Sequence, residues 1–114
     1  MTKLKFVAGA LLAATLVVPT TTAVATSAKG GGATAWTPAA GSSGRIAVKD
    51  GSRDGDPAKA EYRRKASPGT KRTLWNKNGP NTTAYSGSGS RIISFQACDV
   101  NYGDGDDCSG WKAP

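Results

Sequence analysis

Arg91–Tyr102 reads RIISFQACDVNY, and this stretch decides the fold class. Its β-branched and aromatic residues alternate with polar residues, which is typical of a strand with one buried face. The expected inward set changes along the stretch from Ile93, Phe95 and Ala97 to Cys98, Val100 and Tyr102. This change of side predicts either a β-bulge or burial of both faces near Ala97.

Further segments upstream have the same character and are separated by turn residues. RIAVKD at 45–50 alternates, TKRTLWNK at 70–77 reads as another strand, and Thr82–Ser86 follows the turn NGPN. About five or six short strands predict an all-β domain, a small antiparallel sandwich or barrel. The expected core is Ile46, Val48, Tyr62, Leu74, Trp75, Ile93, Phe95 and Trp111.

Residues 57–66 are compatible with two structures. As a helix, Asp56 would be the N-cap and Pro57 the first helical residue. As a strand, Ala58, Ala60 and Tyr62 would share one face, and the strand would pair with RIAVKD across a turn. Propensity favours the helix, whereas the small apolar face of such a helix favours the strand, so both alternatives stay open on these residues alone.

The N-terminus predicts a secretory signal peptide over residues 1–25. Lys3 and Lys5 precede an apolar run, and a small-residue stretch suits cleavage after Ala25, with Ala28 as second choice. We therefore expect a secreted, extracellular protein. No later apolar run is long enough to cross a bilayer, so no membrane span is expected in the mature chain.

Two further regions follow the leader. Residues 26–44 are rich in glycine, serine and alanine and are expected to form a flexible arm. Residues 45–114 are then a single β-rich domain, expected to be a monomer. Cys98 and Cys108 are the only cysteines of the chain and are expected to form one disulfide, which would contribute about 2 to 3 kcal/mol to stability.

The charge of the chain is positive and uneven. The formal net charge is +7, with the excess of basic residues over 26–97 and an acidic C-terminal segment. That segment contains Asp99, Asn101, Asp104, Asp106 and Asp107. These residues are expected to be solvated turn residues, with a calcium ion or a basic partner as the alternatives.

A cationic and aromatic surface is one candidate binding site. It would comprise Tyr62, Arg63, Arg64, Lys65, Lys71, Arg72 and Lys77, with Trp75 between them. Guanidinium groups pair with anions and aromatic rings stack on sugars or bases, so such a surface would bind anionic cell-surface polymers. The alternative is that the charges occupy outward strand positions and the rings belong to the core.

A second candidate is the stretch DGSRDGDPAKAE at 50–61. Asp50, Ser52, Asp54, Asp56 and Glu61 have the spacing of an EF-hand calcium loop. The flanks have strand character and Pro57 lacks the N–H expected at its loop position, so a hairpin turn is favoured over a calcium site. A hairpin would leave Glu61 exposed, whereas a calcium loop would return it to Asp50.

The order of the segments resembles a group of small exported proteins of actinomycetes. The resemblance depends on RIAVKD, Tyr62-Arg63-Arg64, TLWNKNGPNTTAYSGSGSRI and the DxCSxW ending at 106–111, and it covers about residues 45–111. It implies secretion, a β-rich domain and one disulfide near the C-terminus. It also implies that the Asp-Gly step is a hairpin turn and that Ala58–Arg64 is a strand, and it implies no particular activity.

Enzymatic function fits the sequence poorly. The chain has no histidine, and no nucleophile motif such as G-x-S-x-G occurs, so neither catalysis nor a cofactor is expected. We therefore expect a secreted, non-catalytic binding or structural domain of the extracellular space or cell envelope. The alternatives are a cationic module for anionic surface polymers, with a role against other cells, and a calcium-binding extracellular protein.

Overall fold

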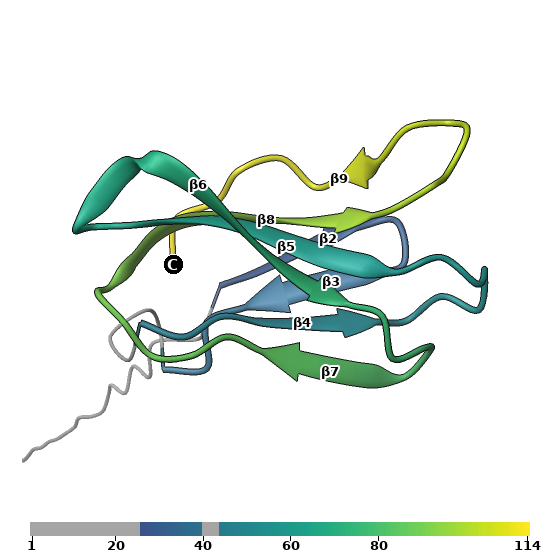
Figure 1. Ribbon diagram of the computed structural model, residues 1–114, viewed down its shortest axis with the longest axis horizontal. Coiled ribbons are helices and arrows are strands. Elements are labelled where there is room, and N and C mark those ends of the chain that lie inside the picture. Colours follow the sequence, from purple (N-terminus) through teal and green to yellow (C-terminus); the bar gives the residue numbers. More distant parts are fainter. Residues whose placement is uncertain (1–25, 40–43) are drawn as a thin grey trace, which may run out of the picture.

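The computed structural model describes residues 26–39 and 44–114, and these residues form strands, turns and loops without a helix (Figure 1). The strands are β2 Ser27–Gly30, β3 Ala33–Trp36, β4 Ala47–Asp50, β5 Ala58–Arg64, β6 Ser67–Asn76, β7 Thr82–Tyr85, β8 Ile92–Asp99 and β9 Asp107–Cys108. The all-β prediction is confirmed, and Ala58–Arg64 is a strand and not a helix. The expected signal peptide at 1–25 lies outside the described residues.

The strands form two antiparallel sheets that pack face to face as a sandwich (Figure 1). One sheet has the order β2-β3-β4-β7 and the other the order β6-β5-β8-β9. Across the interface, β2 packs on β8 and β9, β4 on β5 and β6, and β7 on β6. The two sheets therefore run in matching order, and each covers the apolar face of the other.

The connection between β4 and β5 crosses from one sheet to the other. β4 pairs with β3 and β7, while β5 pairs with β6 and β8. The prediction that RIAVKD and the Tyr62 strand form a hairpin is therefore wrong. The segment 51–57 is long enough to span two packed sheets, which lie about 10 Å apart. Because β4 and β5 lie in different sheets, each of them pairs with two other strands.

Residues 27–36 form a hairpin within the region that was expected to be a flexible arm. Ala28, Ala33 and Ala35 of β2 and β3 are fully buried. Gly31 turns the chain with a φ of 55°, and Gly30 lies directly on the backbone of β8 and β9. The expectation of an arm over 26–44 therefore does not hold for Ser27–Trp36, because small side chains allow this hairpin to dock closely.

The core differs from the expected one at its aromatic members. Ile46, Val48, Tyr62 and Phe95 are buried as predicted, and Leu74 packs partly against them. Trp75 and Trp111 are exposed instead, and Ile92 takes the place of Ile93.

The bulge in β8 explains this exchange of isoleucines. Arg63 pairs with Ser94 but Arg64 pairs with Ile92, so Ile93 is the extra residue. The bulge lies at Ile93 and not at Ala97, where the chain is instead buried on both faces.

Candidate functional site

The solvent side of sheet β6-β5-β8-β9, here called the outer face, carries most of the functional side chains. Alternation along β5 turns Ala58, Ala60 and Tyr62 inward and Lys59, Glu61 and Arg63 outward. Their neighbours on this face follow from the register: Trp75 and Cys98 beside Lys59, Thr73 and Gln96 beside Glu61, and Ser94 beside Arg63.

Two tryptophans lie on the outer face, and each is flanked by cations. Trp75 and Trp111 are both 42% exposed. Lys59 Nζ lies 5.2 Å and Lys77 Nζ 4.9 Å from the centre of the Trp75 ring, and the Arg63 guanidinium lies 5.3 Å from that of Trp111. These cation–π contacts hold the rings in place, and the exposed part of each ring can contact a ligand.

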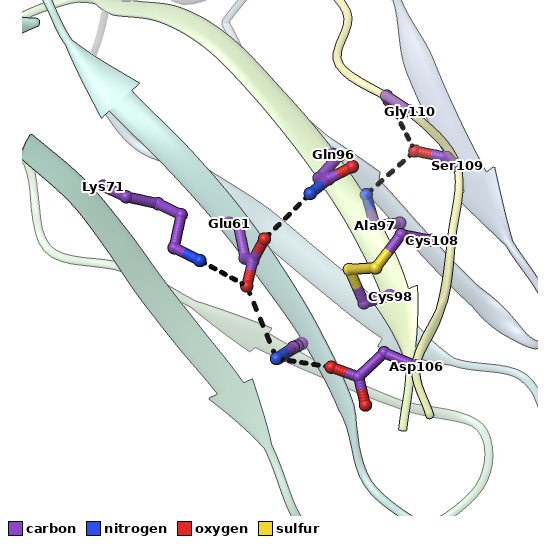
Figure 2. Close-up of a disulfide and its surroundings, with 10 residues drawn as sticks. Glu61, Lys71, Gln96, Ala97, Cys98, Asp106, Cys108, Ser109 and Gly110 are labelled. Carbon is purple, nitrogen blue, oxygen red and sulfur yellow. Dashed lines mark hydrogen bonds and ion pairs between the residues drawn. A yellow bond between two sulfur atoms is a disulfide. The ribbon is translucent and has the colours of Figure 1, made fainter. Parts of the chain in front are cut away.

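Trp111 reaches the outer face because the C-terminal tail runs alongside β8. The Cys98–Cys108 disulfide joins the two segments, as predicted (Figure 2). Beyond it, Lys112 N donates to the Phe95 carbonyl at 2.8 Å, and Phe95 N donates to the Lys112 carbonyl at 2.9 Å. The tail is thus an extension of the sheet, and it positions Trp111 next to the Arg63 side chain.

Glu61 lies at the centre of the outer face in a network of polar contacts (Figure 2). Its Oε1 accepts a hydrogen bond from Gln96 Nε2 at 2.8 Å, and its Oε2 lies 3.2 Å from Lys71 Nζ and 3.4 Å from Lys59 Nζ. Lys59 also pairs with Asp106 at 2.8 Å. Glu61 is only 7% exposed, so the expectation of an exposed Glu61 is wrong.

These contacts change the pKa values of both partners. Burial raises the pKa of Glu61, but the Gln96 hydrogen bond and the charges of Lys71 and Lys59 outweigh it, so the net shift is downward. The hydrogen bond that Lys59 donates to Asp106 is the main cause of a raised pKa for Lys59, which burial opposes. Both shifts favour the charged forms of Glu61 and Lys59 at neutral pH.

The residues of the predicted cationic and aromatic surface lie in different parts of the structure. Arg63, Lys71 and Lys77 reach the outer face. Lys65 is exposed in the β5–β6 turn, and Arg72 donates to the Ser67 hydroxyl at 3.3 Å on the other side of β6. The sequence interpretation missed Lys59 and placed Trp111 in the core, because large aromatic residues usually lie there. Trp75 was expected in the core or, as the alternative, in the cationic and aromatic surface, and the structure exposes it.

Arg64 and Tyr62 are structural and not part of the outer face. Tyr62 is buried in the core, and the Arg64 guanidinium stacks on its ring at 5.3 Å. Arg64 Nη1 also donates to the carbonyl oxygens of Gly44 and Ser90, the latter at 2.8 Å. This arginine joins the loops that flank β4 and β8, so its charge is used within the fold.

The residues of the calcium template do not converge. Asp50 Oδ1 accepts from Ser52 N–H at 3.0 Å and Asp54 Oδ1 from Asp56 N–H at 2.9 Å, which are local turn contacts. Glu61 lies on the outer face and does not return to Asp50. Among residues 26–39 and 44–114, no three potential metal-ligating side chains form a group.

The C-terminal acidic residues have separate environments. Asp106 pairs with Lys59, while Asp104 and Asp107 are exposed. Asp99 is buried beside the β2–β3 turn, where its Oδ2 accepts from Gly32 N–H at 3.1 Å. Its Oδ1 has no hydrogen-bond partner among residues 26–39 and 44–114. Burial, together with the charges of Asp54 and Asp50, raises the pKa of Asp99, and the Gly32 hydrogen bond only partly opposes this. The expectation that all of these are solvated turn residues is thus wrong for Asp99.

Replacing Asp99 with asparagine is expected to stabilise the protein at neutral pH by about 1 kcal/mol. The raised pKa means that Asp99 favours the folded state below its ordinary pKa and loses this contribution as the pH rises through the folded value. An amide keeps the acceptor for Gly32 and carries no charge. Thermal melts between pH 3 and pH 8 should therefore show a gain for the variant that is larger at pH 7 than at pH 3.

Glu61→Gln is the matched control because the pKa of Glu61 shifts the other way. Its ion pairs stabilise the fold above the ordinary pKa and are lost as the pH falls through the lowered folded value. This variant should be less stable than the wild type at pH 7, with the difference shrinking toward pH 3. Equal pH profiles for the two variants would contradict the assignment of Asp99.

No helix in the described part of the chain is long and apolar enough to cross a membrane. Comparison of the whole chain with protein-family models, with curated proteins and with solved structures found no match.

Proposed function

We propose that this protein is a secreted, non-catalytic binding domain whose outer face contacts an extended anionic polymer of the cell envelope or extracellular space. The observation that carries the proposal is the pair of exposed tryptophans on one sheet face, with two lysines beside Trp75 and one arginine beside Trp111. Aromatic rings stack on sugar units, while the neighbouring ammonium and guanidinium groups pair with phosphate or carboxylate.

The spacing of the two rings favours a chain over a single small unit. Trp75 lies beside Lys59 and Trp111 beside Arg63, which are four residues apart on β5. Trp75 is on β6 and Trp111 is on the tail beyond β8, so their backbones are three strand spacings apart, roughly 14 Å at about 4.8 Å per spacing. A ligand that contacts both must therefore contain several repeating units in an extended conformation.

The charge pattern favours moderate, salt-sensitive binding. Glu61 and Asp106 together balance the charges of Lys59 and Lys71, whereas Arg63 and Lys77 have no carboxylate partner in the described part of the chain. Attraction of a polyanion by a few exposed cations weakens as salt screens them, while ring stacking persists. The disulfide on the same face is consistent with an oxidising, extracellular location.

Trp75→Ala is expected to weaken binding of wall teichoic acid or heparin by roughly tenfold, because stacking contributes on the order of 1 to 3 kcal/mol per ring. Calorimetry at low ionic strength would give the affinities of wild type and variant. Tyr85→Ala is the control, since Tyr85 is an exposed ring that stacks with Arg45 on the other sheet. An equal loss for both variants, or no binding by the wild type at low salt, would reject the proposal.

A further inference from the structure

A pocket of about 300 Å³ lies at one end of the sandwich. Three loops converge on it, namely those between β4 and β5, between β6 and β7, and between β8 and β9. Its walls are formed by Asp50, Gly55, Asp56, Pro57, Lys77, Gly79, Pro80 and Tyr102. Loops held by a rigid sandwich in this way are frequent positions for ligand sites.

The Asp50 carboxylate indicates which kind of ligand the pocket could bind. The side chain is 2% exposed, and its Oδ1 accepts a hydrogen bond from Ser52 N–H at 3.0 Å. Within residues 26–39 and 44–114, no cation lies at ion-pair distance from this carboxylate. A buried carboxylate is costly unless a positive charge compensates it, and Asp56 adds a second carboxylate to the same pocket.

The remaining walls suit the carbon atoms around a positive charge. Tyr102 is 70% exposed and stands in the pocket wall with Pro57 and Pro80. An aromatic face attracts an ammonium group, and the proline rings provide apolar contacts for its methylene neighbours. A bare metal ion would gain little from such walls, since calcium requires six or more oxygen ligands.

We propose that this pocket binds the ammonium group of a compact organic ligand, such as a non-acetylated amino sugar. The carboxylates of Asp50 and Asp56 neutralise the ammonium, and Tyr102 covers it. Lys77 also lines the pocket, but its Nζ lies 4.9 Å from the Trp75 ring, so its positive charge is held at the outer face by this ring. The site stands on its own geometry and does not depend on polymer binding at the outer face.

Titration of the ¹⁵N-labelled protein with glucosamine, followed by amide NMR spectra, tests the proposal. We expect saturable shifts for Gly55, Gly79 and Tyr102, and at least a fivefold weaker response in Asp56→Asn. Asp104→Asn removes an exposed carboxylate of the β8–β9 loop that does not line the pocket, so this control should respond like the wild type. Melting curves verify that both variants are folded.

Several outcomes would overturn the proposal. These are the absence of saturable shifts, equal shifts with neutral N-acetylglucosamine or with sodium chloride at the same ionic strength, and equal responses of the two variants. Saturation of the same amides by calcium chloride without a response to glucosamine would assign the pocket to a metal ion instead. Heparin binding, measured separately, reports on the outer face alone and distinguishes failure there from failure of the pocket.

Discussion

Replacing Gly30 with alanine is expected to lower the free energy of unfolding by at least about 3 kcal/mol. The added Cβ would lie 2.5 Å from the Ala97 carbonyl oxygen, and 2.7 Å from both the Asp107 carbonyl oxygen and the Ser109 nitrogen. All three are backbone atoms of paired segments and cannot move aside as a flexible side chain would. The hairpin β2–β3 must therefore shift away from β8, which opens the alanine-lined part of the core.

The test is denaturant unfolding of Gly30→Ala beside Gly69→Ala. Gly69 lies in β6, and a Cβ there would meet no atom within 4 Å, so this control should be neutral or slightly stabilising. For a domain of this size, 3 kcal/mol corresponds to a fall in melting temperature of roughly 10 to 20 °C. Equal stability of the two variants would mean that residues 27–36 do not dock on β8 in solution.

Removal of the disulfide is the second change with a large expected effect. The double variant Cys98→Ala/Cys108→Ala should lose about 3 kcal/mol, because a bridge between residues ten positions apart restricts the unfolded chain. The bridge also holds the tail along β8, so the tail is expected to fray and Trp111 to leave the outer face. We therefore expect both lower stability and weaker polymer binding from one change.

Urea unfolding and heparin affinity measure the two effects. The wild type treated with a reductant should behave like the double variant in both assays, which controls for the change of side chains at 98 and 108. Trp111→Ala should reproduce the loss of affinity with a much smaller loss of stability, since Trp111 is 42% exposed and lies outside the core. Full affinity in the double variant would show that the tail keeps its position without the bridge.

The strands with large inward residues could be predicted from the sequence, and those with small ones could not. Val48 and Phe95 alternate with polar neighbours, and their strands are found where expected. Ala28, Ala33 and Ala35 have the composition of a linker, yet they are fully buried. Their burial depends on the close approach of two backbones, which is a tertiary property that no local pattern contains.

Strand pairing was the second point that the sequence left undetermined. An Asp-Gly step next to two alternating segments is typical of a hairpin, but here the segment crosses between sheets. The choice depends on the partners that β4 and β5 find elsewhere, namely β7 and β8. These partners are distant in sequence, so local turn chemistry could not identify them.

For the candidate site, the sequence identified the residue types but not the face of the sheet on which each residue lies. Alternation in β5 correctly implies that Arg63 faces outward and Tyr62 faces inward. The prediction that Tyr62 and Arg63 belong to one binding surface did not take this alternation into account. The exposure of Trp75 and Trp111 follows from their cross-strand neighbours and from the path of the tail. Neither the cross-strand neighbours nor the path of the tail can be inferred before the strand register is known.

The tail has a further consequence for the behaviour of the protein among its own copies. An unpaired strand at the margin of a sheet offers its N–H and C=O groups to any other extended chain. The hydrogen bonds of Lys112 with Phe95 and of Ser109 with Ala97 occupy these groups on β8. The C-terminal segment therefore covers the edge of β8, and loss of the Cys98–Cys108 bridge is expected to expose this edge to pairing with other chains.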